Sequence, residues 1–232
     1  MFDRRLYKRR ALCQLKGRWR LPVLLSLVTT LLTSCLLLPV LRGANSEMTM
    51  HPGHSSVQVP AVLLLAAIAA CGVLVTANVG VHLRLLRTES RAAFSLFLRG
   101  MEHWYGGALG ALWFTLWTSL WSLLFIIPGI VKAVSYSQMF FVLAEYPHVG
   151  VCRAMHISKV LTQGHKTDLF MQFASFAGWM VLCALTCGLG WLLLAPYMQQ
   201  TFANSYGALK NEAIAGGRLC PADFAGSTAS YL

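Results

Sequence analysis

The sequence predicts an all-α fold: a polytopic membrane protein with a six-helix transmembrane bundle and two interfacial amphipathic helices. Three observations lead to this prediction. Hydrophobic residues make up 56% of the chain and charged residues only 12%, with a mean hydropathy of +0.59, unlike an average soluble domain. Apolar runs long enough to cross a bilayer recur along the 232 residues. The basic residues behind the net charge of +11 flank these runs, which favours contact with anionic lipid over nucleic-acid binding.

A helix needs about 20 apolar residues to cross a bilayer. The predicted spans are 21–41, 61–83, 107–127, 129–144, 169–186 and 189–209. Pro128-Gly129 separates the third from the fourth. One kinked helix over both would be about 57 Å long at 1.5 Å per residue, so we predict two helices joined by a tight turn. A matching break at 187–190 separates the fifth and sixth. The spans form one transmembrane domain, 21–209, between a basic N-terminal segment, 1–20, and a polar tail, 210–232.

The distribution of Lys and Arg predicts the orientation. With six spans and a cytoplasmic N-terminus, 17 of the 19 basic residues lie in cytoplasmic segments, while Arg42 lies outside and Lys132 lies in the membrane. A five-helix arrangement would place loop 145–168 outside and lose this agreement. We therefore predict that both termini are cytoplasmic.

The N-terminal region also has features of a signal peptide. Basic residues precede an apolar run, and Leu32-Thr33-Ser34-Cys35 resembles a lipobox. However, the apolar run continues through residues 36–40 instead of turning polar, and five further spans follow. We therefore predict an uncleaved first helix.

Two cytoplasmic segments have amphipathic patterns. In 90–101, Phe94, Phe97, Leu98 and Met101 share one helical face. In 151–163, apolar residues share a face and basic or polar residues point away. Both segments lead directly into a predicted span, which favours helices lying at the interface. Docking of a partner protein is the alternative.

Polar residues inside the predicted spans define a candidate site. A polar cavity between the last four spans would be lined by Lys132, Ser135, Tyr136, Tyr197, Gln200 and Asn204. Charged residues at bilayer depth are often functional. Two simpler interpretations compete: Lys132 lies one turn from the outer end of its span and can extend to the head groups, and amide and hydroxyl residues commonly join membrane helices. No Asp or Glu lies in any span, so no carboxylate proton relay is expected.

The fourth and sixth spans resemble each other at an offset of 61 positions. Gly129, Tyr136, Gln138 and Phe141 correspond to Gly190, Tyr197, Gln199 and Phe202, and Leu124 corresponds to Leu185. Such matches predict two helical hairpins of the same orientation related by duplication, a plan that many transporters use.

Other chemistry is sparse. The sequence has no GxSxG, HExxH, P-loop or glycine fingerprint, so we expect neither an enzyme nor a cofactor. Seven scattered cysteines without CxxC spacing favour reduced thiols over a disulfide framework. Met48, Met50, His51 and His54 lie close together in the outer loop. Met and His can bind copper, although a flexible loop cluster of this kind is usually not a metal site.

The chain resembles the bacterial integral-membrane proteins of domain-of-unknown-function family 975. The resemblance rests on Gly17-Arg-Trp19 after a basic stretch, Phe94–Gly100, the central motif Leu120–Tyr136, Phe176-Ala-Gly-Trp179 and Ala195–Gln199. The chain departs from the family pattern at His165-Lys166, where Gly-Asn-Lys is usual, and in its longer polar tail. The resemblance implies a multi-pass protein of the bacterial inner membrane. It supplies no catalytic or ligand residue.

These patterns lead to two functional hypotheses. The first is transport or permeation of a small solute, ion or lipid, lined by the polar residues of the spans. The second is a non-catalytic membrane scaffold or accessory subunit that binds lipid or a partner protein through its basic loops. Membrane lipid is an expected partner and nucleic acid is not. A homo-oligomer and a membrane partner both stay open.

Overall fold

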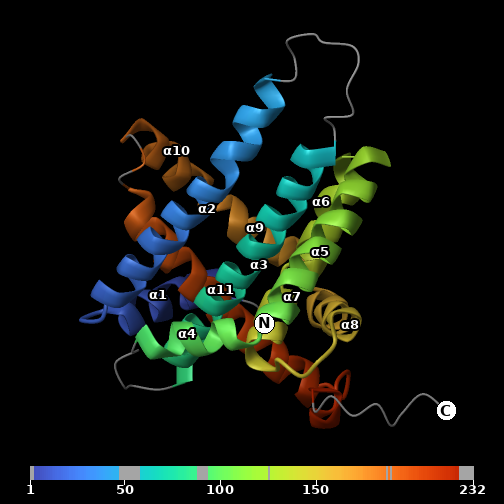
Figure 1. The fold of residues 1–232 in the computed structure, drawn as a ribbon. Coiled ribbons are helices and arrows are strands. Elements are labelled where there is room, and N and C mark those ends of the chain that lie inside the picture. The colour runs from blue at the N-terminus through green and yellow to red at the C-terminus, as the bar shows by residue number, and fades with distance from the viewer. Residues whose placement is uncertain are drawn as a thin grey trace, which may run out of the picture.

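The computed structural model describes residues 3–46, 58–87, 94–124, 126–186, 188 and 190–224, and these parts are all-helical (Figure 1). The predicted all-α class is therefore confirmed. The elements are α1 (Arg4–Leu15), α2 (Arg20–Ser46), α3 (Gln58–Arg87), α4 (Phe94–Glu102), α5 (Trp104–Leu124), α6 (Ile126–Tyr136), α7 (Met139–Glu145), α8 (Val151–Thr162), α9 (Lys166–Ala174), α10 (Ala177–Leu185), α11 (Trp191–Ala215) and the short 3₁₀ helix η1 (Pro221–Phe224).

Helix α3 is the centre of the molecule. It packs against α2, α4, α5, α7 and α11. In Figure 1, α2, α3 and α5 all extend toward the top of the picture. Small residues allow the close approach of α3 and α5: a Cβ added at Gly72 would lie 2.3 Å from both the Ala111 Cβ and the Gly107 carbonyl oxygen. Such contacts are typical of membrane helix pairs, whose backbones meet through small residues.

Within the described residues, three helical stretches are long and apolar enough to cross a membrane: Val62–Arg87, Trp104–Leu124 and Lys166–Leu185. A fourth is possible if Arg4–Leu15 and Arg20–Leu36, which meet at 103°, form one broken span. The structure thus supports three to four spans by length and composition. Helix α11 is long but carries Gln199, Gln200 and Asn204, and the predicted fourth span is divided between α6 and α7 at Ser137-Gln138.

The turn between the third and fourth predicted spans falls earlier than Pro128-Gly129. Helix α5 ends at Leu124 and α6 begins at Ile126, so the proline lies in the first turn of α6. Proline is accepted there because the first-turn N–H groups have no partner within the helix. The predicted return of the chain is present, because a Cβ at Gly129 would lie 2.4 Å from the Ser122 Oγ.

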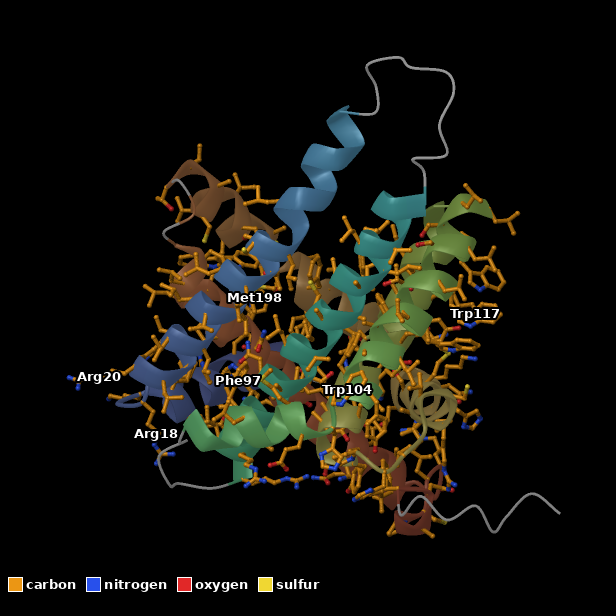
Figure 2. The ribbon with its side chains drawn as sticks, viewed as in Figure 1. Arg18, Arg20, Phe97, Trp104, Trp117 and Met198 are labelled. Carbon is orange, nitrogen blue, oxygen red and sulfur yellow. The ribbon has the colours of Figure 1, made fainter. Side chains whose placement is uncertain are left out.

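The two predicted amphipathic segments are both helical. Helix α4 buries Phe97, which is 3% exposed and labelled in Figure 2. Helix α8 buries Ala154, Ile157 and Leu161 and leaves His156 and Lys159 exposed. The amphipathic pattern of α8 is therefore present and its apolar face packs within the protein, whereas Leu98 and Met101 on the predicted apolar face of α4 are exposed. A location at a membrane surface stays a prediction.

The N-terminal segment is folded onto the rest of the protein. Asp3 caps the N-terminus of helix α1: its carboxylate accepts from the N–H groups of Arg5 and Leu6. It packs against α11 and buries Tyr7, Ala11 and Leu15. Beyond it, α2 continues without a break through the lipobox-like residues 32–35. At the other end of the chain, α11 extends past residue 209 to Ala215.

Candidate functional site

The predicted polar residues of α6 lie on two different neighbours. Lys132, which is half-buried, places its Nζ 4.6 Å from the centroid of the Trp121 ring on α5. The Ser135 carbonyl oxygen accepts from Ser158 Oγ on α8 at 2.7 Å. Tyr136 is 2% exposed and belongs to the main hydrophobic core. These three residues join α6 to α5 and α8.

Two of the predicted residues of α11 form a buried hydrogen-bond network. Gln200 and Asn204 both donate to Gln14 Oε1 on α1, at 2.8 and 3.0 Å. Gln200 Oε1 lies 2.8 Å from His82 Nδ1 on α3, so this ring nitrogen is the donor. The network joins α1, α3 and α11 through polar side chains away from solvent.

Tyr197 is separate from this network. Its ring meets Phe176 edge-to-face, with centroids 5.5 Å apart. It lines an apolar cavity of about 420 Å³ together with Trp19, Trp179 and Leu193. The six predicted residues thus occupy three environments, and no hydrogen bond or ring contact between described side chains joins Lys132 to Gln200 or Asn204.

A larger cavity of about 580 Å³ lies between α3, α6, α7, α9 and α11. None of the described residues in its walls is charged. They are formed by Val75, Val79, Ile130, Ala133, Val134, Ser137, Gln138, Phe140, Phe141, Leu169, Phe170, Phe173, Gln199 and Phe202. Val75, Ile130, Phe170 and Phe173 are exposed, so the cavity opens at the outer surface of the helices. Its volume is in the range of ligand-binding pockets.

Two glutamines that line this cavity have side-chain oxygens without partners. Gln138 Oε1 and Gln199 Oε1 are buried and accept no hydrogen bond. The Gln138 amide nitrogen donates to Ser137 Oγ at 3.1 Å. Leaving a buried acceptor unsatisfied costs about 1–3 kcal/mol, so each oxygen would be stabilised by a hydrogen-bond donor. Neither glutamine was among the predicted site residues, although both are in the aligned repeat.

The two glutamines correspond at the sequence offset of 61, although Gln138 lies between α6 and α7 and Gln199 lies inside α11. A Cβ at Gly190 would lie 2.7 Å from Cys183 Sγ, as one at Gly129 would lie 2.4 Å from Ser122 Oγ. Each glycine therefore touches the residue seven positions earlier. Phe141 and Phe202, a further pair at the same offset, also line the cavity. The predicted repeat is thus accompanied by a repeated contact, and both halves contribute the same residue types to one space.

A second, polar cavity of about 490 Å³ lies at the end of α3. Its charged and titratable lining residues are Arg84, Arg87, Glu102, His103 and Glu145. Glu145 receives hydrogen bonds from Arg87, Lys210 and Tyr206, the last at 2.6 Å. Burial of Glu145 opposes ionisation, but the hydrogen bonds from Lys210 and Tyr206, with the charges of Lys210 and Arg87, lower the pKa of its carboxyl group. Glu145 is therefore ionised, and its hydrogen bonds connect α7 to α3 and α11.

No metal cluster is visible in the described ranges: no three His, Cys, Asp or Glu residues lie together there. The Met48–His54 group falls outside the described residues. Residues 105–213 match the model of a family described as "Protein of unknown function (DUF975)". No curated protein and no solved structure matches the chain.

Proposed function

Through residues 105–213 the chain belongs to DUF975, a family of proteins of unknown function, and we propose that it is a membrane transport protein for a lipid-like solute. The solute would enter the apolar cavity between α3, α6, α7, α9 and α11. The proposed role involves no enzymatic reaction. It places the chain in the bacterial inner membrane with six spans and both termini in the cytoplasm.

The proposal rests on one observation: the cavity is lined by mainly apolar residues and lies between the predicted spans. Its lining residues come from four of the six predicted spans, 61–83, 129–144, 169–186 and 189–209. Its walls are apolar and aromatic apart from Ser137, Gln138 and Gln199. A charged ion or sugar would lose its hydration there without gaining polar partners. An alkyl chain would gain contact with apolar walls instead.

The outer surface of the helices supports a location in lipid. Large apolar side chains are exposed on several helices, and Leu123 and Leu185 at the ends of α5 and α10 are 87% and 76% exposed. Exposed apolar patches of this kind indicate contact with a membrane or another protein. Lipid can therefore reach the exposed cavity residues Val75, Phe170 and Phe173 without crossing water.

A flux assay tests the proposal. The protein is reconstituted in liposomes, and the movement of a fluorescent single-chain lipid between leaflets is followed by quenching of the outer leaflet. Ala133→Trp fills the cavity, whereas Ala177→Trp adds the same side chain to an exposed position on α10. We expect Ala133→Trp to slow movement about tenfold, equal to about 1.4 kcal/mol of lost stabilisation, and Ala177→Trp to match wild type. Wild-type flux no faster than in empty liposomes would refute the transport role.

A membrane scaffold or accessory subunit is the second candidate, favoured by the basic surface of α1. Gln14 ties this helix to α11 through Gln200 and Asn204, while Arg5, Arg9 and Arg10 stay exposed. Figure 2 shows Arg18 and Arg20 at the edge of the molecule next to this helix. A fixed cluster of arginines suits anionic lipid or an acidic partner. Loss of a co-purifying protein after replacement of the three exposed arginines by Gln, with no flux in wild type, would favour this candidate.

A further inference from the structure

We infer that the large apolar cavity binds a neutral single-chain amphiphile whose head group donates hydrogen bonds to both Gln138 and Gln199, such as the diol head of a monoacylglycerol. This inference rests on the proposed function for the location of the cavity in lipid. It adds the chemical class of the solute.

The unpaired oxygens determine what the head group must offer. Gln138 Oε1 and Gln199 Oε1 are both buried and both acceptors, and both residues line the same cavity. Gln138 is completely buried. A buried acceptor is stabilised only by an N–H or O–H donor. The ligand therefore carries two donors, one for each glutamine.

The charge of the lining excludes an ionised head group. No charged residue lines the cavity among the residues that the structure describes. A carboxylate or phosphate would bring further acceptor oxygens to two acceptors and would be buried without a cation. An ammonium group would supply donors but would be buried without a counter-ion, which is highly unfavourable. A neutral head group with hydroxyl or amide donors avoids both costs.

The walls and the size of the cavity determine the rest of the ligand. Five phenylalanines contribute to the lining: Phe140, Phe141, Phe170, Phe173 and Phe202. A volume of about 580 Å³ is that of a pocket for one small ligand, which suits one alkyl chain. The exposed rings of Phe170 and Phe173 mark where the chain would leave the cavity toward the surrounding lipid.

The internal repeat accounts for the presence of two glutamines in the lining of one cavity. Gln138 and Gln199 are separated by the same offset as Gly129 and Gly190, and each glycine makes the same type of contact in its own hairpin. Two segments related by this offset therefore each contribute a glutamine to the lining of one cavity. A head group with two equivalent hydroxyls fits this pairing.

The test is competition for photolabelling in nanodiscs. The probe is a monoacylglycerol with a diazirine in its acyl chain, and labelled peptides are located by mass spectrometry. The competitors share one alkyl chain and carry a glycerol diol, its dimethyl ether, a carboxylate or a trimethylammonium group. We expect labelling at residues 133–141 and 199–202 that the diol displaces. The other three competitors need at least about tenfold higher concentration, equal to 1.4 kcal/mol of lost binding. Equal competition by the dimethyl ether would overturn the inference.

Variants provide a second arm. Gln138→Met and Gln199→Met keep the length of the side chain and remove the acceptor, and Gln163→Met makes the same change at an exposed position on α8's C-terminal end. Each cavity variant is expected to lose most of the specific labelling while the control keeps it. The ether comparison uses wild-type protein, so it decides the inference even if a variant folds poorly. If labelling is selective for the diol but no lipid flux is found, only the transport role is refuted. If Ala133→Trp abolishes lipid flux but labelling shows no preference for the diol, only the head-group inference is refuted.

Discussion

Lys210 donates a hydrogen bond to Glu145 and another to the hydroxyl of Tyr146, the latter at 2.6 Å. One ammonium group thereby holds two consecutive residues at the end of α7 against the last long helix. Arg87 of α3 reaches the same carboxylate. Three helices that are distant in sequence therefore meet at a single negative charge.

Removal of this charge is expected to destabilise the fold. Glu145→Gln leaves Lys210, which is 13% exposed, without its counter-ion, so we expect a loss of about 3 kcal/mol in the free energy of unfolding at neutral pH. Glu102→Gln, at an exposed residue of the same polar cavity, should change it by less than about 0.5 kcal/mol. Denaturant unfolding in detergent micelles measures both. Equal values for the two variants would contradict a central role for Glu145.

The contribution of Glu145 is expected to depend on pH. The folded pKa of its carboxyl group is lowered from the ordinary value of 4.5, so the unfolded chain takes up the proton more readily than the folded one. The stabilisation is therefore fully present above pH 4.5 and is lost as the pH falls through the lowered folded pKa. The difference between wild type and Glu145→Gln should shrink below pH 4.5 and stay constant above about pH 6. A difference that grows on acidification would have the wrong sign.

The close contact at Gly129 predicts a sharp difference between two glycines. Gly129→Ala would place a methyl 2.4 Å from Ser122 Oγ and 2.8 Å from its Cα, whereas a Cβ at Gly178 meets nothing within 4 Å. Gly129→Ala should cost about 1–3 kcal/mol through overpacking. Gly178→Ala should stabilise α10 by about 0.5–1 kcal/mol, because alanine is the better helix former. Thermal unfolding of both variants is the measurement, and a stabilising Gly129→Ala would contradict the hairpin contact.

The proposed topology is testable with the natural thiols. Cys13, Cys152 and Cys220 are exposed, and each lies in a segment that the six-span arrangement assigns to the cytoplasm. In variants that retain only one of the three, an impermeant maleimide should label inverted membrane vesicles and leave right-side-out vesicles unlabelled. Labelling of Cys152 from the outside would exclude six spans in favour of five.

The unpaired glutamine in the cavity predicts an unusual stability effect. Gln138→Met removes a buried acceptor that has no donor, so the empty protein should become more stable, by about 1 kcal/mol. Gln172→Met is the matched contrast, because Gln172 exchanges two hydrogen bonds with Ser205, at 2.7 and 2.8 Å. This variant should lose stability. Unfolding in detergent without added lipid gives the comparison, and a clear loss of stability for Gln138→Met would show that its oxygen is already satisfied.

The sequence predicted the helical character of the chain but not which helices pack against one another. Apolar length and periodicity predicted this helical character, because both depend on neighbouring residues alone. They did not predict where the helices end: the third predicted span runs past the end of α5, and the fifth is divided between α9 and α10. The break at Ser137-Gln138 was missed because nothing in the local pattern opposes a helix there. Hydropathy also cannot show that Gln200 pairs with Gln14, since this contact joins distant parts of the chain.

The sequence was limited in the same way for the candidate site, because it does not show which distant residues come together. The sequence predicted Lys132 as a site residue because a charge in an apolar run is rare, yet its ammonium lies over the Trp121 ring. Gln138 and Gln199 are ordinary amides in sequence and became informative only when burial and missing partners were known. The repeat was the available signal. Identical polar residues at equivalent positions of two related hairpins indicate a shared space more directly than a single unusual charge does.

The bonds from Gln200 and Asn204 to Gln14 also have a consequence for biogenesis. Gln14 and Gln200 are 186 positions apart, so α1 leaves the ribosome roughly 10 to 40 seconds before its partner at about 5–20 residues per second. During this time the face of α1 that carries Tyr7, Ala11 and Leu15 has no α11 to cover it. A nascent or truncated chain that lacks α11 therefore displays this face, which is covered once α11 has been made. Exposure of the first helix thus marks a chain that does not yet contain α11.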